Sequence, residues 1–111
     1  MLEHDLKQKL QAGELAADSG TLIRALAIVG TNYQYTRLRN LQLALAGGMS
    51  RSAMCSAVNY LSDSGYLDVR TTDGHEAASV SDVALEELEA KLTPKGTQLQ
   101  RGAISDPLVD L

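Results

Sequence analysis

The segment 41–69, LQLALAGGMSRSAMCSAVNYLSDSGYLDV, constrains the fold more than any other part of the chain. A Gly-Gly pair at 47–48 separates two helical patterns, and Ser50 stands where it can cap the second helix, which we expect over 50–64. Gly65 can end that helix, and the residues after it alternate as in a β-strand. The segment therefore predicts a helix, a tight turn, a second helix and a strand.

The second of these helices has two different faces. Its apolar stripe consists of Met54, Ala57, Val58 and Leu61. Its opposite side carries Ser52, Ser56, Asn59 and Asp63. The apolar face is suited to packing against the core, and the polar face is free to contact a ligand or solvent. Two helices joined by a glycine turn and followed by a strand that opens a hairpin are typical of a winged helix-turn-helix, in which the second helix is the recognition helix.

The N-terminal region predicts a short amphipathic helix over 2–12, because leucine recurs at Leu2, Leu6 and Leu10 between charged residues. Gly13 should end or bend this helix. Such a short helix is marginal by itself, so its leucine seam must rest either on the body of the domain or on a second copy of the chain.

A second helix is expected over 20–29, capped by Asp18 or Ser19 and ended by Gly30. Its shared apolar face contains Leu22, Ile23, Leu26 and Val29. A third helix, over 36–46, should bury Leu38, Leu41 and Leu45. Leu43 lies off that stripe, and we interpret it as filling space between neighbouring helices rather than as a partner contact.

The region after the recognition helix predicts a β-hairpin with strands over 66–70 and 88–92. The stretch between them, 71–87, is long for a hairpin loop. It contains an Asp-Gly turn signal at 73–74, and its second part could either extend the strand or form a helical turn. Periodicity leaves both possibilities open.

The C-terminal region predicts a closing helix over 93–102, with Thr93 as its N-cap and Pro94 in its first position. The last nine residues form a tail that either docks on a partner or stays loose. The expected fold class is mainly α with a small antiparallel β-hairpin. We expect a single winged-helix domain over 1–111, comprising the N-terminal helix 2–12, the helix 20–29, the helix-turn-helix 36–64, the wing 66–92, and the C-terminal helix 93–102 with its tail.

Charge is distributed unevenly along the chain, which has a net charge of −4. Residues 21–70 carry five arginines against two aspartates, whereas residues 71–90 carry six carboxylates and no lysine or arginine. The candidate recognition region is therefore basic and the segment after it acidic. We interpret 71–90 either as a solvated loop or as a contact surface for a basic protein partner, and its carboxylates would repel DNA brought close to them.

The cellular setting follows from what the sequence lacks. Cys55 is the single cysteine, so no intramolecular disulfide can form. The apolar runs fall short of the ~20 residues that a membrane span needs, and the N-terminus shows no signal-sequence pattern. We therefore expect a cytoplasmic protein without a membrane partner.

Several stretches carry a resemblance to known families. SRSAMCSAVNYLSDSGYLDV and the later LTPKG resemble winged-helix repressors of the MarR-like and ArsR-like kinds. The opening MLEHDLKQKL, the turn LQLALAGGMSRS and the later LTPKGTQLQRG are together similar to small winged-helix proteins of Mu-like phages and prophages, over nearly the whole length of the chain. The resemblance implies a winged-helix fold and a phage or prophage origin. The long acidic wing departs from the repressor pattern, in which a wing that touches DNA offers arginine or lysine.

Double-stranded DNA is the expected ligand, because short polar side chains and an arginine near the start of the recognition helix suit a major groove. The candidate DNA-binding residues are Arg37, Arg39, Ser50, Arg51, Ser52, Ser56, Asn59 and Arg70. Asn59 could read adenine, and Arg37, Arg39 and Arg70 could hold phosphates. The expected role is transcriptional regulation or phage DNA handling. The alternative is a non-catalytic protein-interaction module that uses its acidic wing.

A homodimer is expected, because a small monomer would leave several apolar side chains exposed. The candidate dimerisation residues are Leu2, Leu6, Leu10, Leu99 and Leu108. Whether the N-terminal helix packs within the chain or across the dimer stays open. A two-fold dimer would suit a pseudo-palindromic DNA site.

Metal binding and catalysis are not expected. Cys55, His4 and His75 form no ligand pair at helical spacing and no CxxC motif. We interpret Cys55 as a packing residue. The sequence contains no phosphate-binding glycine loop, GxSxG, HExxH or dinucleotide fingerprint, so neither an enzyme activity nor a cofactor is predicted.

Overall fold

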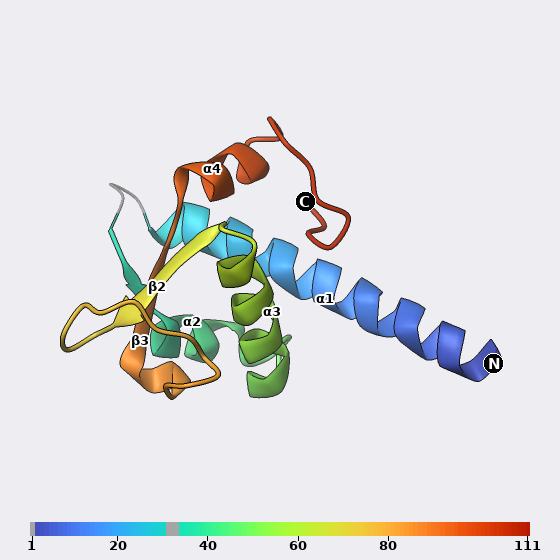
Figure 1. Ribbon diagram of the computed structural model, residues 1–111, viewed down its shortest axis with the longest axis horizontal. Helices are drawn as coiled ribbons and strands as arrows, with labels where there is room; N and C mark the ends of the chain where they lie inside the picture. The colour runs from blue at the N-terminus through green and yellow to red at the C-terminus, as the bar shows by residue number, and fades with distance from the viewer. Residues whose placement is uncertain (1, 31–33) are drawn as a thin grey trace.

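The computed structural model describes residues 2–30 and 34–111, and Figure 1 shows how its elements are arranged. Its elements, in chain order, are α1 (Leu2–Val29), β1 (Thr36–Arg37), α2 (Leu38–Leu45), α3 (Arg51–Asp63), β2 (Leu67–Thr71), the 3-10 helix η2 (Leu85–Glu87), β3 (Leu88–Leu92) and α4 (Pro94–Gln100). The described residues thus form four α-helices and one three-stranded antiparallel sheet.

Helix α1 is one continuous helix of 28 residues, so the expectation of two helices divided near Gly13 is wrong. A glycine inside a helix costs only about 1 kcal/mol relative to alanine, which the packing of the following turns offsets. Ser19, expected as a possible cap, is instead buried within this helix. Gly30 does end it, and its N–H donates to the carbonyl of Leu26 at 2.9 Å.

The core forms where α1, α2 and α3 meet the inner face of the sheet. All four residues of the predicted α3 stripe are at most 1% exposed, which confirms that stripe. Leu22, Ile23 and Leu26 of α1 are also buried, but Val29 is 53% exposed because it lies in the last turn of the helix. Leu43 on α2 is 67% exposed, so the expectation that it fills space between helices is wrong.

The ends of α3 follow the sequence signals. Ser50 is the N-cap, and its hydroxyl accepts the N–H of Ala53 at 3.1 Å. Gly65 has a φ of +84°, which favours glycine, and it lets the N–H of Tyr66 reach the carbonyl of Leu61 at 2.9 Å. The predicted cap and stop are confirmed.

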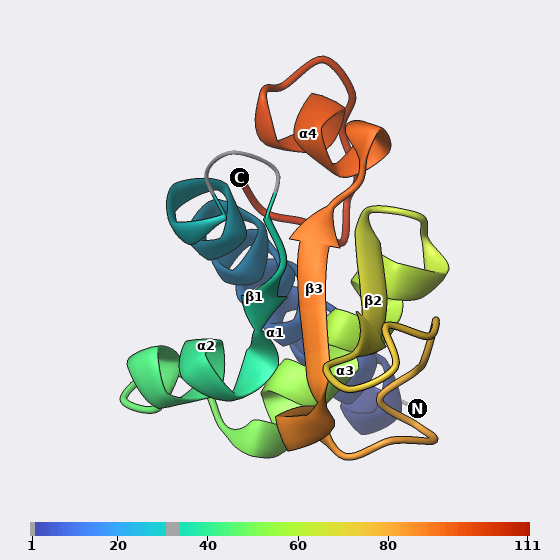
Figure 2. The same ribbon diagram turned by 90° about the vertical axis from the view of Figure 1, so that its left-hand side faces the viewer.

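The sheet has one strand more than the expected hairpin. Its order is β1-β3-β2, and Figure 2 shows β3 between the other two strands. Thr36 pairs with Ala90 and Arg37 with Glu89, so the chain is extended where a helix over 36–46 was expected, and α2 begins only at Leu38. A strand of two residues is too short to produce a recognisable alternation.

The long connection 71–87 contains a helical turn and not an extension of the strand. Arg70 forms an isolated bridge with Ala77, and the chain then turns into η2, where Leu85 is 1% exposed. This buried leucine attaches the end of the acidic segment to the core beside α2.

The C-terminal tail folds back onto α1, as Figure 1 shows, so neither expectation for it is correct. The N–H of Asp110 donates to the carbonyl of Ala16 at 2.9 Å, and Arg24 donates to the carbonyl of Asp110 at 3.1 Å. Before the tail, Thr93 caps α4 as predicted, and its hydroxyl accepts the N–H of Gly96 at 3.0 Å.

Candidate nucleic-acid interface

Three of the candidate arginines lie on or next to α2 and α3. Arg37 ends β1 and Arg39 lies in the first turn of α2, and both are exposed. Arg51 is the first residue of α3. Arg39 and Arg51 both act on the carboxylate of Glu86, so these two positive charges lie near each other.

Arg51 is held by a carboxylate that the sequence did not assign to it. Its guanidinium makes a bidentate ion pair with Glu86 of η2, in which Nη2 donates to Oε2 at 2.9 Å and Nη1 donates to Oε1. The hydrogen bonds from Arg51 lower the pKa of Glu86 to about 2, and those same bonds raise the pKa of Arg51. Both side chains stay close to half exposed, so the pair is accessible to an incoming anion.

The positive charge of Arg39 further lowers the pKa of Glu86. Two arginines thus act on one carboxylate at the junction of α2, α3 and η2. An anion that displaced Glu86 would find a positive site already assembled.

The polar face of α3 borders a groove and is not wholly open to solvent. Ser52 and Ser56 line one side of a groove of about 470 Å³, and α1 contributes Glu14 and Asp18 to the other. Burial raises the pKa of Asp18, and the nearby charge of Glu14 raises it further. Ser50 also lines this groove while it caps α3. Asn59, one turn further along α3, is half-buried.

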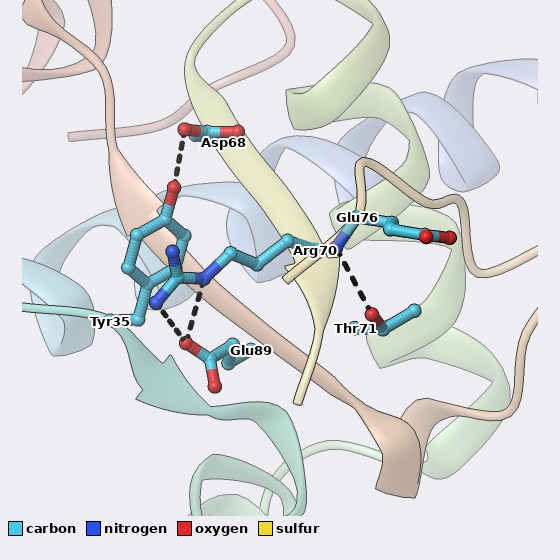
Figure 3. A network of polar contacts seen from close by, with 6 residues as sticks. All are labelled: Tyr35, Asp68, Arg70, Thr71, Glu76 and Glu89. Carbon is cyan, nitrogen blue, oxygen red and sulfur yellow. Dashed lines mark hydrogen bonds and ion pairs between the residues drawn. The ribbon is translucent and has the colours of Figure 1, made fainter. Parts of the chain in front are cut away.

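Arg70, expected to hold a phosphate, is instead engaged on the outer face of the sheet (Figure 3). Its Nε and Nη2 donate to Glu89 on β3 at 2.9 and 2.8 Å, and its guanidinium lies 3.5 Å from the ring centroid of Tyr35. The hydroxyl of Tyr35 donates to Asp68 at 2.5 Å, a bond that raises the pKa of the tyrosine. These contacts fix Arg70 in the sheet, where Glu89 and the ring of Tyr35 already occupy its guanidinium.

The acidic wing therefore offers fewer carboxylates to a partner than its composition suggests. Glu86 and Glu89 are each paired with an arginine of the same chain, the Glu86 pair at the surface and the Glu89 pair largely covered. Exposed carboxylates of the same segment are Asp73, Glu76, Asp82 and Glu87.

The candidate dimerisation residues have different environments. Leu6 and Leu10 are exposed on α1, whereas the side chain of Leu2 lies outside the described residues. Leu99 is only 2% exposed in the core of its own chain, so the expectation that a monomer leaves it uncovered is wrong. Leu108 is half-buried in the tail.

One polar cluster had no sequence signal that we recognised. The hydroxyls of Tyr60 and Tyr66 donate to one oxygen of Asp106 at 2.7 and 2.8 Å, and the other oxygen accepts the N–H of Leu108 at 2.9 Å. Burial raises the pKa of Asp106, but these hydrogen bonds outweigh it, so the pKa lies below its usual value. The cluster fastens the tail to α3 and to the residue that precedes β2.

Within residues 2–30 and 34–111, no three His, Cys, Asp or Glu side chains converge as metal ligands would. Cys55 is half-buried and packs against the core. In the same part of the chain, none of the helices has both the length and the apolar character needed to cross a bilayer.

Comparison of the chain with protein-family models, with curated proteins and with solved structures finds no match.

Proposed function

We propose that this chain is a winged helix-turn-helix protein that binds double-stranded DNA through the N-terminal part of α3 and the arginines beside it. The observation that carries the proposal is the order of the elements. A helix and a short strand precede the pair α2 and α3, two further strands follow, and the third strand lies in the middle of the sheet. This is the arrangement expected when a helix-turn-helix is backed by a sheet whose last two strands form a wing.

The residues at this surface suit contacts with phosphates and base edges. Arg37 and Arg39 are exposed on the α2 side, and Arg51 occupies the first turn of α3. Arginine is the preferred residue for bidentate phosphate contacts, and Ser52 adds a short exposed hydroxyl next to Arg51 in the chain. In this proposal DNA phosphate replaces Glu86 as the partner of Arg51.

The resemblance to small winged-helix proteins of Mu-like phages suggests where such binding would act. We place it in transcriptional regulation or in the handling of phage DNA, inside the cytoplasm of a bacterial host.

A second candidate function is supported by the acidic groups around α3. Glu14 and Asp18 line the groove beside this helix, and Glu86 pairs with its first residue, Arg51. A surface of this kind suits a basic protein segment, so the chain could be a non-catalytic interaction module on the same scaffold. The exposed carboxylates Asp82 and Glu87 would then belong to the contact.

The proposal is tested by titrating labelled duplex DNA with the protein at several salt concentrations. We expect saturable binding that weakens as salt rises, because each phosphate contact contributes about −0.9 to the slope of log K against log salt. Changing Arg37 and Arg39 to alanine should reduce that slope by about 2. The control is Arg101→Ala, which removes one exposed arginine at the end of α4, outside the proposed interface, and should change the slope little.

The outcomes separate the two candidates. No binding of the wild-type protein at low salt rejects the DNA proposal. A basic peptide that binds in a manner sensitive to charge reversal at Asp82 and Glu87, but not to the changes at Arg37 and Arg39, supports the interaction module. Glu89 is not included in the charge reversal, because its pair with Arg70 supports the sheet.

A further inference from the structure

The first half of α1 leaves an apolar seam uncovered. Residues 3–14 are all exposed, and Leu6 and Leu10 remain 59% and 60% exposed. Figure 1 shows this half of α1 extending away from the rest of the molecule. A helix of about twelve residues is marginal in water when nothing packs against it, so a partner that covered the seam would stabilise the extension.

Around Leu6, the leucines of this extension are arranged symmetrically and the charges change sign. Leucines occupy positions 2, 6 and 10. The acidic residues Glu3 and Asp5 precede Leu6, and the basic residues Lys7 and Lys9 follow it at the same distances. A second copy running antiparallel and centred on Leu6 sets the acidic end of one helix against the basic end of the other. A parallel copy would set acidic ends together and basic ends together, which is less favourable.

We propose that two copies of this chain pair through the first three turns of α1, antiparallel, with the two-fold axis at Leu6. The interface is isologous, because each copy offers the same seam. Stable protein interfaces bury roughly 1,200–2,000 Å² in total, and three helical turns bury less. The dimer therefore forms and dissociates with protein concentration.

The pairing sets the distance between the two copies of α3. The groove between α1 and α3 is lined on α1 by Gln11, Glu14, Leu15 and Asp18. At 1.5 Å per residue, these residues lie about 8 to 18 Å along the helix from Leu6. Along the α1 axis, the two α3 helices of a dimer are then separated by about 15 to 36 Å. The upper end of this range matches the separation of about 34 to 36 Å between half-sites one turn apart on DNA. This last step rests on the proposed function, whereas the pairing does not.

Sedimentation equilibrium of the full chain over a wide concentration range tests the pairing. We expect a monomer–dimer equilibrium that Leu6→Glu shifts to monomer. The control is Leu43→Glu, which places the same charge at a leucine of similar exposure on α2 and should leave the equilibrium unchanged. Because Leu6 is exposed, Leu6→Glu should leave thermal unfolding of the monomer unchanged. A wild-type protein that stays monomeric at all concentrations overturns the proposal, as does dissociation by Leu43→Glu alone.

The orientation is tested by disulfide formation in a Cys55→Ser background, which removes the native thiol. Antiparallel pairing predicts that Leu2→Cys and Leu10→Cys proteins cross-link when mixed, while each alone does not. Cross-linking of Leu2→Cys with itself, without any mixed product, overturns the antiparallel arrangement. DNA titration of the same samples keeps the two ideas apart. A dimer that binds no duplex contradicts only the proposed function, and a monomer that binds duplex contradicts only the pairing.

Discussion

The ion pair between Arg51 and Glu86 predicts that removing one carboxylate strengthens DNA binding. In Glu86→Gln, the guanidinium of Arg51 loses the partner that now holds it with two hydrogen bonds. Arg51 is then available to a phosphate without competition, and Arg39 loses the same nearby negative charge. We expect the variant to bind duplex DNA more tightly than the wild-type protein.

The magnitude follows from counting phosphate contacts. One added contact steepens the slope of log K against log salt by about 0.9, which corresponds to a gain of roughly fivefold to tenfold in affinity at 0.1 M salt. The matched control is Glu87→Gln, because Glu87 is an exposed neighbour whose change alters the net charge equally. The control should shift affinity slightly through the overall field and leave the slope nearly unchanged.

Fluorescence anisotropy of a labelled duplex, measured for the wild type and both variants at four or more salt concentrations, gives these slopes. The double variant Arg51→Gln with Glu86→Gln should lose the gain, since the arginine that makes the new contact is gone. Equal slopes for Glu86→Gln and Glu87→Gln would falsify the view that Glu86 withholds Arg51 from phosphate.

Two further predictions concern the tail and the core. Gly20→Ala should lower the free energy of unfolding in urea by about 1–3 kcal/mol, because its Cβ would stand 1.8 Å from the carbonyl oxygen of Asp110. The control is Gly13→Ala, in an open part of the same helix, which should raise that free energy by about 0.5–1 kcal/mol. Equal effects of the two substitutions would contradict the docked position of the tail. Burial, and then the hydrogen bond to Asp106, raise the pKa of Tyr66 from 10 to about 12. The unfolded state therefore loses this proton first, and the stability that depends on the protonated tyrosine should be lost as pH rises from 10 through about 12. In urea unfolding, the free energy of unfolding of Tyr66→Phe should fall less steeply between pH 10 and 12 than that of the wild type. An equally steep fall in the variant would contradict the assignment of this pH dependence to Tyr66.

The elements that periodicity describes well were predictable. The α3 stripe, its serine cap and its glycine stop are local signals, and the structure confirms them. The continuity of α1 through Gly13 was not predictable from the sequence. Whether a glycine ends a helix depends on the packing of its neighbours and on contacts with distant segments. Close approach of the tail to Gly20 is such a contact, and the sequence around that glycine carries no sign of it.

The candidate interface was predictable only as a set of exposed side chains. The pairing of Arg70 with Glu89 follows from strand register, which becomes visible once the hairpin is aligned. The pairing of Arg51 with Glu86 joins residues 35 positions apart and depends on a helical turn whose presence periodicity left open. Tyr35 precedes a two-residue strand and gave no pattern at all.

Two ion pairs decide which arginines of this acidic chain are accessible to an anion. Glu86 neutralises Arg51, and Glu89 neutralises Arg70. The pair of Arg70 is supported by Tyr35 and by the sheet, and its two side chains are 26% and 13% exposed, so an anion has little access to it. The pair of Arg51 is 48% and 42% exposed and has no such support. Because exposed ion pairs contribute little to stability, phosphate can compete for Arg51 at small cost to the fold. Arg51 therefore offers its positive charge to an anion only when Glu86 is displaced. For this reason, we expect the charge at position 86, and not the net charge of the chain, to control the affinity for DNA.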